Sequence, residues 1–196
     1  MTLLSPTRTA SRYVEELSFV DGPLALSFLE VYRQAFAPLA RLAPARQGLT
    51  DLEFMEHMAQ PSVVKFIAWD ESGEPMAMAF MATDLNVVPW ISPAYFEARF
   101  PDHFARGAVY YFGALLVSPG HQGGPWASLV LAAATRRVAS AGAVAVFDCC
   151  EHNATRRLPQ LIARAARRVS DLTTVELAPQ RYFAYAQGLA AGTSLP

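Results

Sequence analysis

Apolar and polar positions recur along the chain in two rhythms, one typical of strands and one typical of helices, with turn residues between the runs. In the first half, apolar and β-branched runs predict strands over 12–20, 63–69 and 76–83. Apolar residues at a spacing of three and four predict a helix over 24–35 and a shorter one over 52–58. Thr50 and Glu53 fit a capping box at the start of the shorter helix, and Pro61 ends it.

The second half begins with an aromatic segment that fits neither rhythm. Residues 84–107 carry five aromatic side chains and three prolines, which is too aromatic a composition for a disordered linker. The pattern after this segment predicts a strand over 108–117, a helix over 126–141, a strand over 143–149, a helix over 153–169 and closing strands over 173–177 and 182–186. The chain therefore predicts a mixed sheet with one strand–helix–strand crossover.

Composition indicates a single globular domain. The chain has 196 residues and 53% apolar content, enough for one sizeable core, so we expect one domain over 12–190 with flexible ends at 1–11 and 191–196. Its 17 acidic and 16 basic residues give a net charge of -1. This near balance excludes a strong overall electrostatic attraction to nucleic acid or to an anionic membrane. A small molecule is the expected partner.

Three further features bear on location and metals. The first eleven residues have neither the charge nor the apolar run of a signal peptide or membrane span, so a cytoplasmic protein without membrane insertion is expected. Cys149 and Cys150 are adjacent, where a mutual disulfide would be strained, which suits a reducing compartment. His57 and His103 lie in separate segments without metal-like spacing, and no metal site is predicted.

The most informative segment runs from Leu115 to Leu129, where a strand ends in a glycine-rich loop that opens a helix. Such a junction gathers unpaired backbone N–H groups and the positive end of the helix dipole at one point. This arrangement suits a pyrophosphate. The segment therefore predicts an anion-binding loop.

In sequence the same segment resembles the signature of the GNAT superfamily, Val-x-Pro followed by Gln/Arg-x-x-Gly-x-Gly/Ala. Val117 and Pro119 match the first part, and Gln122 and Ala127 open and close the second. The middle glycine of the family falls on Pro125, whose fixed φ suits the start of a helix but which lacks one N–H donor. Either the neighbouring residues supply the donors, or the loop has decayed and the cofactor binds weakly or not at all.

The order of elements resembles the GNAT fold over nearly the whole chain. The resemblance implies an α/β (α+β) fold: a mixed, mostly antiparallel central sheet of about seven strands flanked by about four helices, with an aromatic insertion before the cofactor strand. It also implies acetyl-CoA or another acyl-CoA as co-substrate, held between two splayed strands. By resemblance, the cofactor-binding residues are Leu115, Leu116, Val117, Gln122, Gly123, Gly124, Trp126, Ala127 and Asn153.

Catalytic candidates are less well defined. Many family members carry a tyrosine acid on the helix after the neighbouring strand, but Leu158, Pro159 and Gln160 occupy that region here. Substitutes must face the opening between the splayed strands. We expect a base or acid among Glu151, His152 and Tyr185, with Tyr110, Asp148 and Tyr182 as further titratable residues near the opening.

The aromatic segment over 85–107 is expected on the substrate side. Trp90, Tyr95 and Phe96, together with Tyr111, are the predicted substrate contacts, although packing in a larger core is an equally good interpretation of any one aromatic residue. A predominantly apolar pocket suits aminoglycosides and polyamines poorly, since these call for acidic walls.

The leading hypothesis is therefore an N-acetyltransferase that transfers the acyl group to an amine of a small molecule or peptide by direct attack. One alternative is a synthase of long-chain N-acyl amino acids or acyl-homoserine-lactone-type products. The other is a catalytically inactive acyl-CoA-binding or sensor protein. A homodimer through residues 182–185 is expected from analogy with the family.

Overall fold

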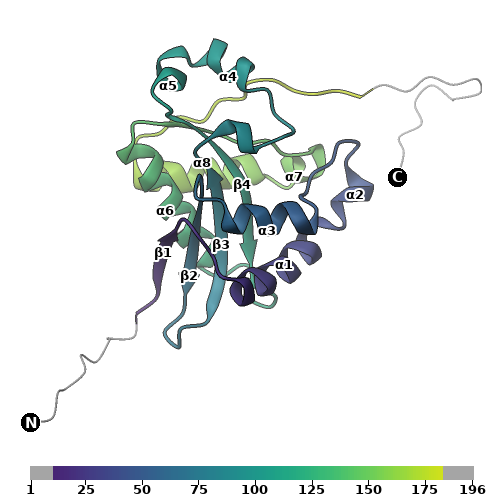
Figure 1. Cartoon of the computed structure of the whole chain (residues 1–196), viewed down its shortest axis with the longest axis vertical. Helices are drawn as coiled ribbons and strands as arrows, with labels where there is room; N and C mark the ends of the chain where they lie inside the picture. Colours follow the sequence, from purple (N-terminus) through teal and green to yellow (C-terminus); the bar gives the residue numbers. More distant parts are fainter. Residues whose placement is uncertain (1–10, 183–196) are drawn as a thin grey trace, which may run out of the picture.

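The computed structural model describes residues 11–182, and the predicted flexible ends lie, apart from residue 11, outside this range. The described residues form five strands in one sheet (Figure 1). In spatial order these are β1 (Tyr13–Leu17), β2 (Val63–Trp69), β3 (Pro75–Ala82), β4 (Val109–Val117) and β5 (Val144–Val146).

The sheet is mixed and mostly antiparallel, as predicted. β1 to β4 pair antiparallel with their neighbours, and β5 joins β4 in parallel. The expected number of about seven strands is not confirmed, since residues 11–182 contain five. The strand predicted over 173–177 is wrong: this segment has no regular structure, and its first four residues are exposed, with Val175 at 63%, so that only Leu177 packs against the core. The strand predicted over 182–186 lies, apart from Tyr182, outside the described residues.

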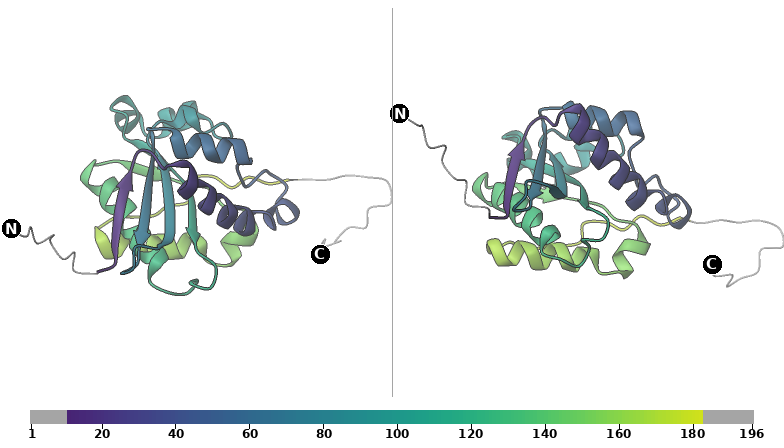
Figure 2. Two further views of the ribbon diagram at one scale, coloured as in Figure 1. Left: turned by 60° about the horizontal axis from the view of Figure 1, so that its bottom comes forward. Right: turned by 90° about the horizontal axis from the view of Figure 1, so that it is seen from below.

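Helices cover both faces of the sheet (Figure 2). The helices are α1 (Gly22–Phe36), α2 (Leu39–Leu42), α3 (Asp51–Ala59), the 3-10 helix η1 (Leu85–Val87), α4 (Pro93–Arg99), α5 (Pro101–Ala105), α6 (Trp126–Ser140), α7 (Glu151–Thr155) and α8 (Leu158–Val169). The capping box at the start of α3 is confirmed, with Glu53 N–H donating to Thr50 Oγ1 and Thr50 N–H donating to Glu53 Oε2.

The core divides into two layers because alternate side chains of a strand point to opposite faces. Val63 and Ile67 of β2 pack with α1 and α3, whereas Val64 and Phe66 pack against α6. α8 packs in turn against α6. Both faces of β2 and β3 are thus buried, which explains their continuous apolar sequence.

Lys65 is a charged residue buried within this largely apolar core. It is 0% exposed, and its Nζ donates to the backbone oxygens of Ser18 and Gln60 at 2.9 Å each. Burial lowers the pKa of Lys65 to about 8. The side chain therefore satisfies two buried carbonyls at the cost of a desolvated ammonium group.

The aromatic segment between β3 and β4 forms η1, α4 and α5 (Figure 1). Phe96, Phe100 and Phe104 pack onto the core layer of α1 and α3. Arg106 Nη2 donates to the backbone oxygen of Gly142 at 2.6 Å, which ties the end of the segment to the start of β5.

Two predicted elements after β4 differ from the structure. The strand predicted over 143–149 is reduced to Val144–Val146, because the chain then leaves the sheet. The single helix predicted over 153–169 is divided into α7 and α8, because Arg157 adopts a positive φ of 65° and Pro159 follows in the first turn of α8.

Candidate active site

β4 and β5 separate within the sheet. β5 pairs with β4 only from Val109–Val144 to Tyr111–Val146, while β4 continues to Val117. Beyond Tyr111, this side of β4 has no strand partner among residues 11–182. The separation leaves backbone N–H and C=O groups of β4 facing an opening.

A β-bulge in β4 lies at the same opening. Phe80 pairs with Ala114 and Met81 pairs with Phe112, so that Gly113 is the extra residue. A Cβ atom on Gly113 would lie 2.3 Å from Phe80 Cε2, so that the ring or the strand would have to shift. Glycine is therefore required here for the Phe80 ring to approach the strand closely.

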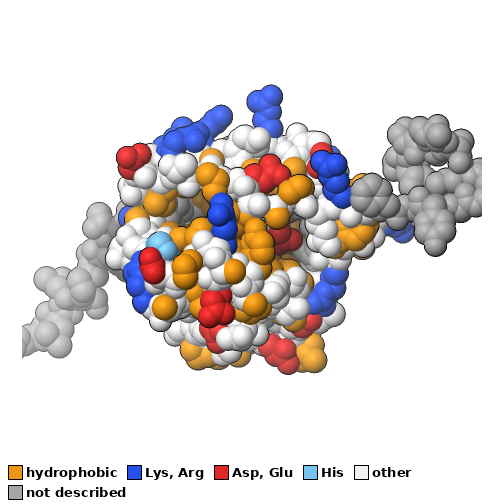
Figure 3. Space-filling model, turned by 90° about the horizontal axis from the view of Figure 1, so that it is seen from above, with side chains coloured by type: hydrophobic (Ala, Val, Ile, Leu, Met, Phe, Trp, Pro, Cys, Tyr) orange, Lys and Arg blue, Asp and Glu red, His pale blue; other side chains and the backbone are white. Residues whose placement is uncertain are grey.

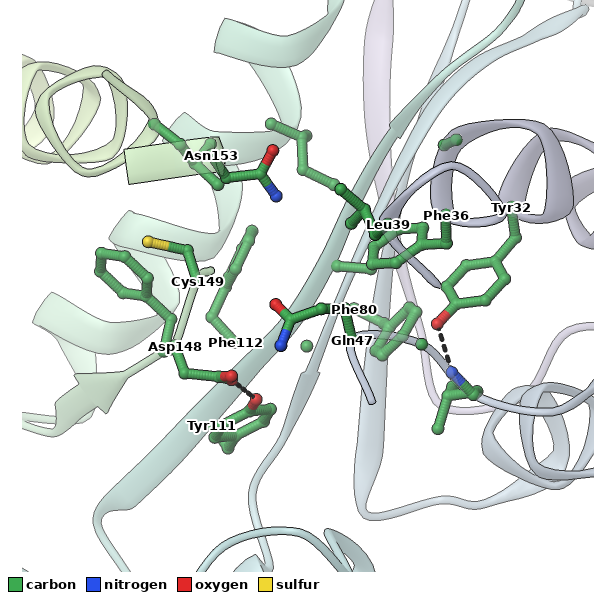
Figure 4. A pocket seen from close by; sticks show the side chains of 18 of the residues that line it. Tyr32, Phe36, Leu39, Gln47, Phe80, Tyr111, Phe112, Asp148, Cys149 and Asn153 are labelled. Carbon is green, nitrogen blue, oxygen red and sulfur yellow. Dashed lines mark hydrogen bonds between the residues drawn. The ribbon is translucent and has the colours of Figure 1, made fainter. Parts of the chain in front are cut away.

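A cavity of about 260 Å³ occupies the opening (Figure 4). It is bounded by β4, by the chain after β5, by α1 and by the segment that follows α2. The polar and charged side chains that line it are Tyr32, Arg46, Gln47, Tyr111, Asp148 and Asn153. Aromatic side chains, among them Phe36, Phe80, Trp90, Phe112 and Phe147, form much of the remaining wall.

Three of these side chains form a hydrogen-bonded row. The indole Nε1 of Trp90 donates to the hydroxyl of Tyr111 at 2.8 Å. The Tyr111 hydroxyl donates in turn to Asp148 Oδ1, the bond that Figure 4 marks with a dashed line. Burial, followed by the nearby Asp148 carboxylate, raises the pKa of Tyr111 far above its usual value. The phenol therefore stays protonated and acts as a fixed donor to Asp148.

On the opposite wall the polar groups are already partnered. The Tyr32 hydroxyl accepts from the backbone N–H of Leu49 at 2.6 Å, and burial raises the pKa of Tyr32 to about 12. Arg46 Nη1 donates to both carboxylate oxygens of Glu53, at 2.7 and 2.9 Å. The positive charge at this end of the cavity is thus balanced.

The glycine-rich loop after β4, which the sequence predicts to bind an anion, is held in a defined turn conformation. Gly120 and Gly123 have positive φ values of 79° and 82°, and Gln122 Oε1 accepts from Gly120 N–H at 2.9 Å. Gln122 thereby stabilises the loop with its own side chain. A Cβ atom at Gly123 would meet no atom within 4 Å, so the space beside it is open.

α6 begins directly after this loop without a side-chain cap. The backbone N–H groups of Trp126, Ala127 and Ser128 have no acceptor among residues 11–182. Together with the positive end of the dipole of this 15-residue helix, they present hydrogen-bond donors of the kind that can bind an anion.

The structure brings some predicted site residues together and leaves others apart. Trp90, Tyr111, Leu115 and Asn153 line the cavity, the last from α7. Leu116 points its side chain into the core, as expected for alternation along β4. Gln122, Gly123, Gly124, Trp126 and Ala127 form the loop and the start of α6.

Of the remaining predicted residues, those within the described range do not line the cavity. Glu151 and His152 are on α7 and do not line the cavity, and Tyr185 lies outside the described residues. Tyr95 is 42% exposed on α4 and stacks edge-on against Phe96. Their proposed roles stay predictions.

The side of the cavity formed by α1 and the segment after α2 was not predicted. Tyr32 and Phe36 follow the helical rhythm of α1 and look like ordinary core residues in the sequence. Arg46 and Gln47 stand in an irregular segment without a motif. Only the tertiary fold brings them opposite β4.

No cluster of three or more metal-binding side chains occurs among residues 11–182. Over the same range, no helix has the length and apolar character needed to cross a bilayer.

The sequence matches no protein-family model and no curated protein. Among solved structures, it is similar to an aminoglycoside acetyltransferase from an uncultured soil metagenomic sample, with 14% identity, a TM-score of 0.48, and coverage of 88% of this chain and 99% of the other. AAC(6')-Iy in complex with a CoA-containing bisubstrate analogue has 13% identity and a TM-score of 0.46, with coverage of 88% and 99%.

A third similar structure is the ribosomal-protein-alanine N-acetyltransferase from Brucella melitensis biovar Abortus, with 12% identity, a TM-score of 0.45, and coverage of 88% of this chain and 100% of the other. Each of these three proteins is by name an acetyltransferase.

Proposed function

We propose that this protein is an acyl-CoA-dependent N-acyltransferase that transfers an acetyl group to the amine of a small molecule or peptide. One observation carries the proposal: the free edge of β4 leads from the cavity at the strand separation directly into the glycine-rich loop and the uncapped start of α6. A ligand with a reactive end, a polar arm and an anionic group fits such a path.

The residues along this path fit CoA. Unpartnered N–H groups at Trp126, Ala127 and Ser128 would hold the pyrophosphate, and the open space beside Gly123 allows close approach. Pro125 lacks a donor, but the helix still presents three others after it. The unpaired edge of β4 from Leu115 to Val117 would accept the amide groups of the pantetheine arm.

The bound co-substrate would supply an acyl thioester, and the chain would supply position and a water-poor setting. The cavity of about 260 Å³ is slightly smaller than most small-molecule pockets, which supports a short acyl group over a long chain. Residues 12–190 act as one domain in this proposal, since α1, α3 and α6 share a single sheet. Cytoplasmic location and a homodimer stay predictions from the sequence.

Acyl-CoA binding without catalysis is a second candidate. Leu158, which lines the cavity, has no hydroxyl group that could protonate the leaving thiolate. The hydroxyl groups of Tyr32 and Tyr111 are both engaged in hydrogen bonds within the protein. Turnover distinguishes the two candidates, because both require CoA to bind.

Calorimetry with acetyl-CoA, propionyl-CoA and free CoA tests the proposal first. We expect binding of all three, followed by release of free thiol when amines are added with acetyl-CoA. Binding without thiol release over a broad amine panel would favour the non-catalytic candidate. Absence of binding to all three compounds would reject both.

A further inference from the structure

Asp148 stands at the point where β4 and β5 separate, held by the row Trp90–Tyr111–Asp148. We infer that the Asp148 carboxylate binds the ammonium group of the acceptor and takes its proton, and that the acceptor is a monoamine with an apolar or aromatic body. The inference rests on the proposed acyl transfer for its chemistry, but the amine site it assigns can be tested without CoA.

The direction of the hydrogen bonds fixes the role of each group in the row. An indole N–H can only donate, so the Tyr111 oxygen accepts from Trp90 and its proton points to Asp148. Because burial keeps the Tyr111 phenol protonated, Asp148 is the acceptor and is oriented through Oδ1. Its second oxygen, Oδ2, has no hydrogen bond or ion pair within residues 11–182, and the residue is exposed at the cavity.

The charges on the cavity wall limit the acceptor to one positive charge. Asp148 and Arg46 are the only charged residues in the described wall, and Arg46 is paired with Glu53. A polyamine or aminoglycoside would place several ammonium groups near a single carboxylate, which leaves charges desolvated without partners. On the face seen from above, charged side chains of both signs are scattered among hydrophobic ones and form no acidic field (Figure 3).

The rest of the wall suits an apolar body. Tyr32, Phe36 and Phe80 on one side and Phe112 on the other present aromatic rings to the cavity (Figure 4), and Phe147 also lines it. Such walls bind flat or alkyl groups through buried apolar area. The Asp148 carboxylate then orients the ligand, with its ammonium end at the point where β4 and β5 separate.

The transfer step balances with these groups alone. One ammonium proton passes to Asp148, and the freed lone pair of the nitrogen attacks the thioester carbonyl carbon of the acyl-CoA. The new C–N bond forms as the C–S bond breaks, with its electron pair leaving on the thiolate. A second nitrogen proton passes to the thiolate, and the proton held by Asp148 is released to solvent.

Titration of the protein with 2-phenylethylamine, in the absence of CoA, tests the amine site directly. We expect wild-type protein to bind this amine, and Asp148→Asn to weaken binding at least about tenfold, because the neutral amide cannot pair with an ammonium group. Spermidine should bind no more tightly than 2-phenylethylamine. Glu71→Gln, which makes the same change in the exposed turn between β2 and β3, should bind both amines as wild type does.

Turnover adds a readout that a purely structural role would not move. With acetyl-CoA present, Asp148→Asn should lower kcat/KM by roughly 10²–10⁴, the usual contribution of a general base, while leaving acetyl-CoA affinity unchanged. Tyr111→Phe keeps the ring but removes the donor to Asp148, so it should give a smaller loss. Near-UV circular dichroism of both variants checks that they are folded.

The outcomes separate the two proposals. Amine binding that depends on Asp148, with no acetyl-CoA binding, would reject the proposed function and support the ammonium site. The inference is overturned if no monoamine binds, if Asp148→Asn binds amines as wild type does, or if spermidine binds more tightly than 2-phenylethylamine.

Discussion

Lys65 shows how one residue links burial to the pH dependence of stability. It is the only lysine of the chain and is fully buried in β2, with its ammonium group on two backbone carbonyls. Its folded-state pKa of about 8 lies below the unfolded value of 10.5, so the unfolded state binds more protons between these pH values. Lys65 therefore destabilises the fold most below pH 8, and this cost disappears as the pH rises from 8 to 10.5.

A comparison with Lys65→Met measures this effect. We expect the free energy of unfolding of wild type, relative to the variant, to rise by roughly 2–3 kcal/mol between pH 7 and pH 10. Urea unfolding at both pH values gives the difference, and groups that titrate in both proteins cancel. A difference that does not change with pH would show that Lys65 has an ordinary pKa in the fold.

Gly113 is the residue on which the bulge of β4 depends. Gly113→Ala would place a Cβ atom 2.3 Å from Phe80 Cε2, so the ring or the strand must move. We expect a loss of stability of about 1–3 kcal/mol, as is usual for overpacked sites. Thermal unfolding measures it, with Gly22→Ala as the control, since a Cβ atom there meets nothing within 4 Å.

A double variant identifies the cause of that loss. Phe80→Leu shortens the side chain that meets the new methyl group, so Gly113→Ala should cost less in this background than in wild type. Equal costs in the two backgrounds would mean that the ring is not what requires glycine at the bulge.

At the scale of elements, the start of α6 allows us to predict how an added negative charge would change stability and acetyl-CoA affinity. Ser128 is exposed in the first turn of α6, and its N–H is one of the unpartnered donors. Ser128→Glu places an acidic group where the helix dipole favours it but where a pyrophosphate is repelled. We expect unchanged or higher thermal stability together with acetyl-CoA affinity lowered roughly tenfold, which corresponds to about 1.4 kcal/mol.

Ser128→Gln is the matched control, because it has the size of glutamate without the charge. Calorimetry should show that its acetyl-CoA affinity is close to that of wild type. If the glutamate and glutamine variants bind acetyl-CoA equally, the anionic part of CoA does not lie at the start of α6.

The elements that the sequence predicted well are those with strong local signals. The capping box of α3, the hairpin of β2 and β3, and the glycine-rich turn before α6 depend on residues that are neighbours in the chain. The end of β5 could not be predicted, because Phe147 and Cys149 continue an apolar run although they line the cavity. Apolar character alone does not distinguish a strand from a cavity wall.

The candidate site also combines a part that local sequence signals predict with a part that only the tertiary fold creates. The glycine-rich loop, which is predicted to bind an anion, is a local motif, whereas the cavity needs Tyr32 and Arg46 to meet β4 across the fold. Asp148 was recognised as a titratable residue near the opening, but its bond to Tyr111 depends on the parallel pairing of β4 with β5. No spacing in the sequence reports a contact between residues 37 positions apart.

At the scale of the whole molecule, the proposed path of the co-substrate passes along three elements of the fold. It runs from α7, which contributes Asn153, along β4 to the start of α6. A ligand bound along this path should stabilise the folded state by about 2.7 kcal/mol at 100 times its Kd. Differential scanning calorimetry with and without acetyl-CoA measures the shift.

Hydrogen exchange shows where that stabilisation acts. Acetyl-CoA should slow exchange at the loop from Gly120 to Gly124 and at the first turn of α6, while the turn between β2 and β3 should exchange as before. Protection spread evenly over the sheet, or confined to α4 and α5, would place the ligand elsewhere.

The positions of the three tryptophans also give the protein a set of optical reporters. Trp90 stands at the cavity, Trp126 at the start of α6, and Trp69 at the end of β2 beside Tyr13. An amine that fills the cavity should change the emission of Trp90, whereas free CoA should act mainly on Trp126. Single Trp→Phe variants would then allow fluorescence to show the order in which the two ligands arrive.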